Sequence, residues 1–196
     1  MNKTQYLALF GALVLFLGLY FGFDTKTDKQ KTTEQSRALV GESTSLETLT
    51  SDAKAHLEGS QVTEITALEQ KAANAASDPE RAAALKQLSG LWYRLGQIPV
   101  AGGIAEQVAE LENADSSWSV AGATFFNGLA TSQDPVIRQF CADHAVKAFE
   151  SAASLAPQNV EYRVNLALVY AENPPPDNPM KAVLMLRDLE SKHPES

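Results

Sequence analysis

Cysteine, histidine and basic residues are scarce in this chain, and each shortage excludes a class of protein. Cys141 is the only cysteine, so no disulfide can form within the chain and no multi-cysteine metal site is available. The 16 Lys and Arg residues are outnumbered by 24 Asp and Glu, which gives a formal net charge of -8. A nucleic-acid-binding protein needs a basic face to neutralise phosphates. We therefore expect no nucleic-acid partner.

Residues suited to catalysis or metal binding are few and widely spaced. The histidines His56, His144 and His193 do not have the spacing that places two metal ligands on one helical face. Cys141 and His144 are three positions apart and would allow a Cys-His pair, but a cysteine in an apolar helical run is more typical of a core. Glu106 and Glu110 are best explained as part of a solvated acidic surface. We expect no enzyme activity, no metal and no cofactor.

The segment Tyr6–Phe23 (YLALFGALVLFLGLYFGF) is a long apolar run that carries no charge. As a helix rising ~1.5 Å per residue it would be about 27 Å long, close to the thickness of a hydrocarbon core. A cleaved signal peptide would need small residues before the cleavage site, and these are not evident. The sequence predicts an uncleaved anchor over residues 1–23, in a plasma (inner) membrane, followed by a polar tether over residues 24–44. A cleaved leader and a buried soluble helix are the alternatives.

The charges that flank the anchor bear on its orientation. The positive-inside rule compares Lys3 and the terminal amine on one side with Lys26, Lys29, Lys31 and Arg37 on the other. This favours a cytoplasmic carboxyl-terminal domain and leaves a periplasmic one open. Residues 43–196 hold 11 Lys and Arg against 20 Asp and Glu, a net charge of -9. Such a domain is repelled by an anionic lipid surface.

Alanine is abundant, with 29 copies, and alanine favours helices over strands. The fold class expected is therefore all-α. Apolar spacings of three and four predict helices over Ser45–Leu57 and Val62–Ala76, the second capped by Ser60, which together form an amino-terminal pair within residues 45–78. Asp78 followed by Pro79 predicts the start of the next helix at Pro79.

Three similar strings follow one another through residues 79–196, at about 80–114, 115–158 and 159–196. The clearest is Trp118-x-x-Ala121-Gly122-x-x-Phe125, then Ala145-x-x-x-Phe149-x-x-Ala152-x-x-x-x-Pro157. Before it come Leu88-Ser89-x-x-Trp92 and Ala101-x-x-x-Ala105-x-x-Val108, and after it Leu166-Ala167-x-x-Tyr170 and Ala182-x-x-x-Leu186-x-x-Leu189-x-x-x-x-Pro194. Over about residues 80–194 the chain resembles the tetratricopeptide repeat (TPR) family, here as a membrane-anchored bacterial member. The resemblance implies an α-solenoid of helix-turn-helix repeats behind the transmembrane helix.

The repeats depart from a uniform pattern in two places. The interval from Gly122 to Ala145 is 11 residues longer than its counterpart, which predicts two lengthened helices with a turn near Asn127-Gly128 and Asp134-Pro135. At the carboxyl-terminal end the last helix is expected to leave one apolar face uncovered, at Val183, Leu184, Leu186 and Leu189. A partner chain, a second copy or further residues would cover it, so self-association through this end is one expectation.

The resemblance also implies where partners bind, because the first helix of each TPR lines a groove. The positions projected onto that groove are Lys86, Gly90, Tyr93, Arg94, Ser119, Ala123, Phe126, Asn127, Val164, Asn165, Leu168 and Glu172. Among them the main candidates are Lys86, Tyr93, Arg94, Phe126, Asn127 and Asn165. These are too few in cations for a carboxylate clamp and favour a mixed groove anchored by Tyr93 and Phe126. Alternatively, both aromatic rings pack between helices.

The function predicted from these features is a non-catalytic scaffold that binds protein partners beside the membrane. An assembly chaperone or accessory subunit of an envelope complex, as in cytochrome c maturation, is the second hypothesis. A regulatory domain for a separate enzyme is the third.

Overall fold

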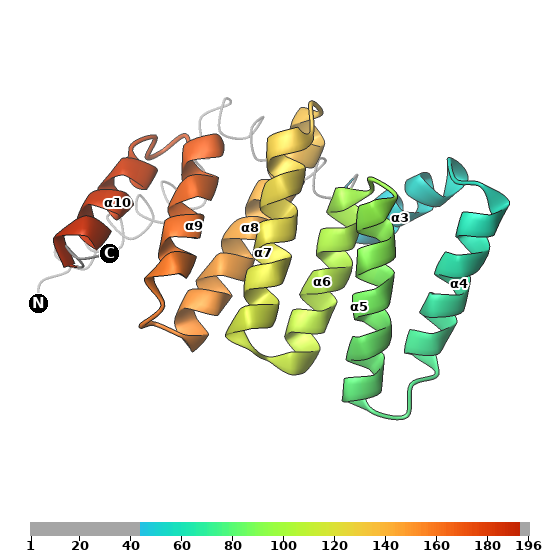
Figure 1. Cartoon of the computed structure of the whole chain (residues 1–196). Coiled ribbons are helices and arrows are strands. Elements are labelled where there is room, and N and C mark those ends of the chain that lie inside the picture. Colours follow the sequence, from blue (N-terminus) through green and yellow to red (C-terminus); the bar gives the residue numbers. More distant parts are fainter. Residues whose placement is uncertain (1–43, 193–196) are drawn as a thin grey trace, which may run out of the picture. The chain divides into compact units, whose positions relative to one another are not determined.

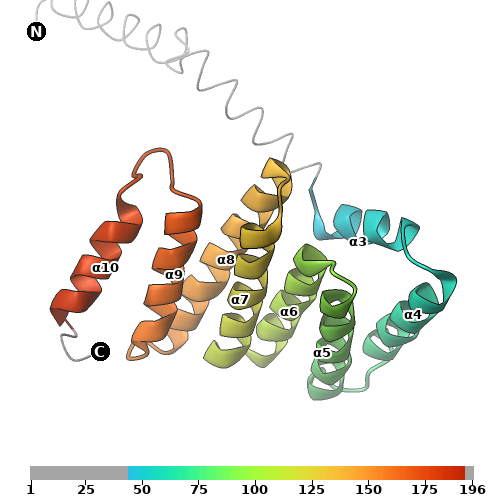
Figure 2. The same ribbon diagram turned by 45° about the horizontal axis from the view of Figure 1, so that its top comes forward.

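The computed structural model describes residues 44–192, and this part of the chain consists of eight α-helices packed in sequential pairs (Figure 1). The all-α expectation is confirmed. From α4 onward each helix packs mainly against its neighbours in the sequence, as two views of the stack show (Figures 1 and 2). Helix α3 instead packs mainly against α6. The helices are α3 (Leu46–Ala55), α4 (Gly59–Ala73), α5 (Asp78–Arg94), α6 (Ile98–Glu112), α7 (Asp115–Thr131), α8 (Pro135–Leu155), α9 (Val160–Glu172) and α10 (Lys181–Lys192).

The expected anchor at Tyr6–Phe23 and the tether that follows it lie outside the described residues. Within residues 44–192, no helix combines the length and the apolar character that crossing a bilayer requires.

Two helix starts differ from those expected. Helix α4 begins at Gly59 after the N-cap Glu58, whose backbone N–H donates to Gln61 Oε1 at 3.0 Å, so Ser60 lies in the first turn and not at the cap. Helix α5 is capped by Ser77, one residue before the expected Asp78, because the Ser77 hydroxyl accepts from the Glu80 N–H. Serine and aspartate are equally good caps, so composition alone does not distinguish them.

The long interval between Gly122 and Ala145, in the α7–α8 pair, is accommodated mainly by one helix. Asn127 and Gly128 lie inside α7, so the turn expected there is wrong, and the turn occupies residues 132–134. Helix α7 has 17 residues, as α5 does, whereas α8 has 21 against 15 in α6. Asp134 caps the longer helix by accepting from the Val136 N–H at 2.7 Å.

Small residues occupy the points where neighbouring helices meet, as the sequence predicted. A Cβ atom added to Gly122 would lie 2.9 Å from the Phe149 ring, and one added to Gly102 would lie 2.7 Å from the Phe125 ring. Both rings are themselves fully buried, so each fills the space that the glycine leaves. The expected crossing positions are all buried, namely Ala101, Ala121, Gly122, Ala145, Ala167 and Ala182.

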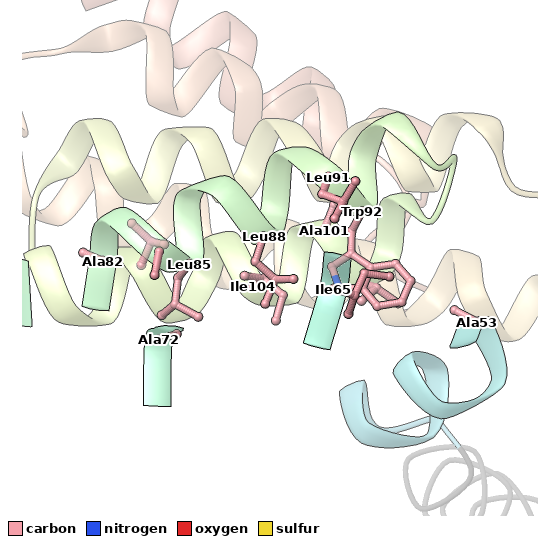
Figure 3. Close-up of a cluster of buried hydrophobic side chains, with 13 residues drawn as sticks. Ala53, Ile65, Ala72, Ala82, Leu85, Leu88, Leu91, Trp92, Ala101 and Ile104 are labelled. Carbon is pink, nitrogen blue, oxygen red and sulfur yellow. The ribbon is translucent and has the colours of Figure 1, made fainter. Parts of the chain in front are cut away.

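Trp92 is the largest side chain in the core of the amino-terminal half and is fully buried beside Ile65 and Ala101 (Figure 3). Its Nε1 has no hydrogen-bond acceptor within the described residues. A buried donor without a partner costs about 1–3 kcal/mol of desolvation. Burial of the apolar indole surface therefore stabilises the core, and the desolvation of Nε1 offsets part of this stabilisation.

A Trp92→Phe variant should consequently be tolerated better than the loss of ring size suggests. We expect it to change the free energy of unfolding by less than about 1 kcal/mol, whereas Trp92→Ala should cost about 3–5 kcal/mol. Urea unfolding of the full chain in detergent micelles, followed by circular dichroism, measures both. A Phe variant that is as destabilised as the Ala variant would show that Nε1 is hydrogen-bonded in solution.

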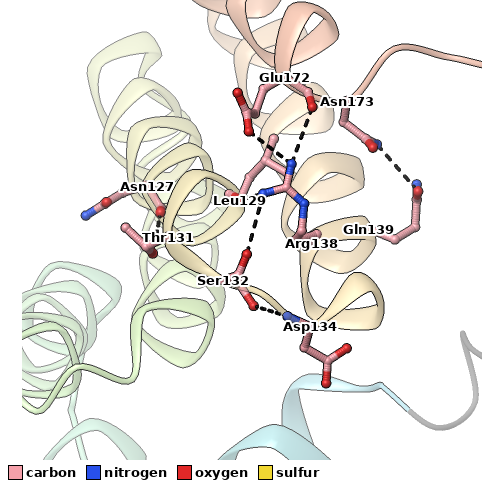
Figure 4. A network of polar contacts seen from close by, with 9 residues as sticks. All are labelled: Asn127, Leu129, Thr131, Ser132, Asp134, Arg138, Gln139, Glu172 and Asn173. Carbon is pink, nitrogen blue, oxygen red and sulfur yellow. Dashed lines mark hydrogen bonds and ion pairs between the residues drawn. The ribbon is translucent and has the colours of Figure 1, made fainter.

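Arg138 joins the ends of three helices in the carboxyl-terminal half (Figure 4). Its Nη1 donates to the Leu129 carbonyl at 2.6 Å, near the end of α7, and its Nη2 donates to Glu172 Oε1 at 3.0 Å and to the Glu172 carbonyl at 3.4 Å, at the end of α9. A cation beside carbonyls that lack helical partners also complements the negative ends of both helix dipoles. Arg138 thus ties α7, α8 and α9 together.

Candidate functional site

A pocket of about 470 Å³ opens between α5, α6 and α7, on the surface formed by the first helices of the pairs. Ala105 and Val108 of α6 are buried and form its apolar base, and Tyr93 and Val120 line its sides. Lys86 lies at its edge. The complete lining is Lys86, Ser89, Gly90, Tyr93, Ala105, Val108, Ser116, Ser117, Val120 and Thr124. We call this pocket the α5–α7 groove.

The expected site residues divide between this groove and other places. Lys86 and Tyr93 line it, and Asn127 of α7 lies beside it because its Nδ2 donates to the Tyr93 hydroxyl at 2.7 Å. Arg94 is exposed at the end of α5. Phe126 is half-buried against the core cluster of the carboxyl-terminal half, so packing between helices holds for this ring. Tyr93, by contrast, is 47% exposed.

Asn165 is half-buried on α9 and does not line the groove. Of the six main candidates, Lys86, Tyr93 and Asn127 are therefore brought together by the fold.

Val120 is the large exposed residue of the groove that the sequence analysis missed. It is 60% exposed, more than any other large apolar side chain in the described part of the chain. The positions projected from the TPR family were Ser119 and Ala123. Each stands one position before a residue that lines the groove, Val120 and Thr124 respectively. A usable signal was present nevertheless, because α7 contains no charged residue after Asp115 while the domain around it is strongly charged. A helix surface without charge in such a domain indicates contact with something other than water.

One ion pair fixes the polar edge of the groove. Lys86 Nζ donates to Glu112 Oε1 at 2.6 Å, and the Ser117 hydroxyl donates to the other carboxylate oxygen. The hydrogen bond from Lys86, followed by that from Ser117, holds the pKa of Glu112 below its usual range. Arg94 makes no ion pair within residues 44–192, so its charge is available at the surface.

A second polar cluster lies between α6 and α8, the second helices of their pairs. Glu106 of α6 is buried, which corrects the expectation of a solvated carboxylate. From α8, His144 Nδ1 donates to its Oε2 at 2.6 Å and Lys147 Nζ donates to its Oε1 at 2.5 Å. Burial alone would raise the pKa of Glu106, but the hydrogen bonds from His144 and Lys147 and their charges outweigh it and lower the pKa. Through these two contacts Glu106 joins the α5–α6 pair to the α7–α8 pair.

Lys147 also borders a second, more open pocket of about 680 Å³ on α8, next to Trp118. Its lining mixes both signs of charge with serines and one exposed leucine, Leu155.

In the described part of the chain, Cys141 and His144 are not hydrogen-bonded to each other. Cys141 is fully buried, as predicted for a core residue, and burial raises the pKa of its thiol to about 12. The thiol is therefore protonated at neutral pH and is a poor nucleophile. His144, its only nearby candidate base in the sequence, bonds to Glu106 through Nδ1. Within residues 44–192, no group of three or more His, Cys, Asp or Glu side chains is placed to hold a metal ion.

Comparison with known proteins adds no family to this description. The sequence matches no protein-family model and no curated protein.

Proposed function

We propose that this chain is a membrane-anchored, non-catalytic scaffold of the TPR type, and that its α5–α7 groove binds a segment of a partner protein. The observation that carries the proposal is the groove itself. It combines a buried apolar base, two large exposed side chains, Tyr93 and Val120, and a cationic edge at Lys86. Apolar anchors surrounded by polar groups are the usual composition of a peptide-binding surface.

The arrangement of the helices supports the TPR assignment. Sequential helix pairs with small residues at their contacts are what stacked helix-turn-helix repeats require. The first helices of successive pairs contribute to one surface, as α5 and α7 do at the groove. An extended or helical segment could lie across these helices, with one apolar side chain inserted beside Val120.

The membrane part of the proposal rests on the sequence of Tyr6–Phe23. An anchor in the inner membrane followed by a polar tether would hold the groove near other membrane proteins. Tethering raises the effective concentration of the groove toward such partners, so a modest affinity suffices. The charge distribution around the anchor favours the cytoplasmic side.

Site-specific photo-cross-linking tests the groove. A photoreactive amino acid at Thr124, which lines the groove, should give a discrete protein adduct when the full chain is irradiated in native membranes. Val120→Asp places a charge in the apolar contact and should lower the adduct yield about tenfold. The matched control is Ala67→Asp, an exposed alanine of α4 far from the groove in sequence.

The same experiment separates the proposed roles. One stoichiometric adduct supports a subunit of a complex, and many weak adducts support a chaperone with several clients. The groove is not the binding site if Val120→Asp leaves the adducts unchanged or if Ala67→Asp reduces them equally.

The anchor makes its own prediction. Deleting residues 1–23 should move the protein from the membrane pellet to the supernatant, because the remaining domain has a net charge of -9 and no affinity for anionic lipid. Fractionation in high salt, with the full chain as the control, measures this. Full retention of the deleted form in the pellet would contradict the anchor. Protease access to Lys26–Lys31 in sealed vesicles then reports which side the domain faces.

A further inference from the structure

Helix α10 lies at one end of the described helical stack (Figures 1 and 2). Its outer face is apolar. Ala182 and Leu189 are buried against α9 and its neighbours, so the expectation that Leu189 is uncovered is wrong. Val183, Leu184 and Leu186 are exposed, as expected. The exposed apolar residues of this face are Met180, Val183, Leu184 and Leu186, and half of the large exposed apolar side chains in the described residues lie here.

The repeated sequence pattern indicates what is missing from this face. Leu186 stands four residues after Ala182, as Phe149 stands after Ala145 and Ala105 after Ala101. Ala105 is 5% exposed and Phe149 1% exposed, whereas Leu186 is 38% exposed. Ala105 clusters with Trp118 of α7, and Phe149 with Leu166 of α9. In the α5–α6 and α7–α8 pairs, therefore, the next helix covers this position.

A second position in the same pattern reaches forward along the stack. Five residues after the alanine stand Glu106, Glu150 and Arg187. Glu106 bonds to His144 and Lys147 of α8, and Glu150 accepts from the Tyr170 hydroxyl of α9 at 3.4 Å. Arg187 is exposed and makes no ion pair or side-chain hydrogen bond within residues 44–192. At the position that elsewhere bonds to a later helix, α10 thus carries a cation that has no partner among residues 44–192.

We propose that the outer face of α10 binds an amphipathic helix of a partner protein, and that a carboxylate on this helix pairs with Arg187. The apolar stripe of the partner helix packs on Met180, Val183, Leu184 and Leu186, where α7 and α9 pack on the equivalent faces of α6 and α8. Because Arg187 has the opposite sign to Glu106 and Glu150, it selects a partner helix with a carboxylate at the facing position.

A second copy of this chain fits the face less well. Two domains of net charge -9 repel each other. A head-to-tail contact would need an apolar face at the other end of the stack, and α3 and α4 expose no large apolar side chain.

The fold supplies a probe for this surface, because α9 is the helix that covers the equivalent face of α8. The probe is a synthetic peptide with the α9 sequence, Val160–Glu172, carrying Tyr170→Glu so that its carboxylate meets Arg187. A lactam between Glu161 and a lysine introduced by Asn165→Lys keeps it helical, since a helix this short is marginal in water. The matched peptide carries Tyr170→Gln. Binding to the full chain in neutral-lipid nanodiscs is followed by fluorescence anisotropy.

We expect the Glu peptide to bind about threefold to tenfold more tightly than the Gln peptide, and this preference to vanish with Arg187→Gln. Leu184→Asp should abolish binding of both peptides, and Val120→Asp in the α5–α7 groove should leave it unchanged, so the outcome is independent of the groove proposal. Three results would overturn the inference: no binding at millimolar peptide, a Glu preference that survives Arg187→Gln, or a concentration-dependent dimer that Leu184→Asp dissociates.

Discussion

A Gly122→Val variant is expected to lose about 3 kcal/mol or more of unfolding free energy. The glycine lies on α7, where an added Cβ would come within 2.9 Å of the Phe149 ring of α8, and that ring is 1% exposed. The ring has no free space to move into, so a larger residue forces α7 and α8 apart or drives Phe149 from its rotamer. Because α9 packs on the same ring cluster, the loss should extend into the carboxyl-terminal half.

Denaturant unfolding of the full chain in detergent micelles, followed by circular dichroism, measures this loss. The matched control is Gly90→Ala on α5, where the nearest atom to the added Cβ is Arg94 Nη1 at an ordinary 3.6 Å. This change should stabilise the protein by about 0.5–1 kcal/mol, since alanine is the better helix former. The second variant Gly122→Val/Phe149→Leu should recover part of the loss. A Gly122→Val protein as stable as the unsubstituted chain would mean that the helices lie further apart than described.

A Glu106→Gln variant is expected to lose about 1–3 kcal/mol of unfolding free energy at pH 7. The change leaves His144 and Lys147 without the buried carboxylate that accepts from both. Each of these partners is partly exposed and can regain water, which keeps the loss below that of a fully buried pair. Glu112→Gln, at a more exposed ion pair, is the control and should cost less than about 1 kcal/mol.

The loss should also depend on pH in a defined direction. The pKa of Glu106 is lower in the folded chain than its ordinary value of 4.5, so the unfolded chain takes up the proton first as the pH falls. The stabilisation is complete above about pH 5 and disappears as the pH falls below 4.5 and through the folded-state pKa. The difference in unfolding free energy between the parent chain and Glu106→Gln should therefore shrink between pH 6 and pH 3. A difference that grows toward acid would contradict the lowered pKa.

The sequence predicted those features of the helices whose signals lie within a few neighbouring residues. Alanine content and spacings of three and four residues gave the fold class, and the Ser77-Asp78-Pro79 run placed the start of α5 to within one residue. The repeated strings also predicted which small residues would be buried, because two helices can approach closely only where small side chains lie between them.

Contacts between distant residues were not predictable in the same way. Glu106 was expected to be solvated, and it is buried because His144 and Lys147 approach it from 38 and 41 positions along the chain. The groove residues were projected by analogy, and Val120 was missed because a shift of one position turns a helical side chain by about 100°. Arg138 gave no local sign that it would bond to both α7 and α9.

The sequence by itself determined that residues 44–192 are helical, the start of α5 to within one residue, and which small residues lie between helices, since capping and periodicity act within a few positions. Only the tertiary structure decided which surfaces remain for binding. A side chain is free or covered according to the helix that packs on it, so Leu186 is exposed where Phe149 is buried in the same pattern. Arg187 is without a partner for the same reason, because no helix among the described residues follows α10.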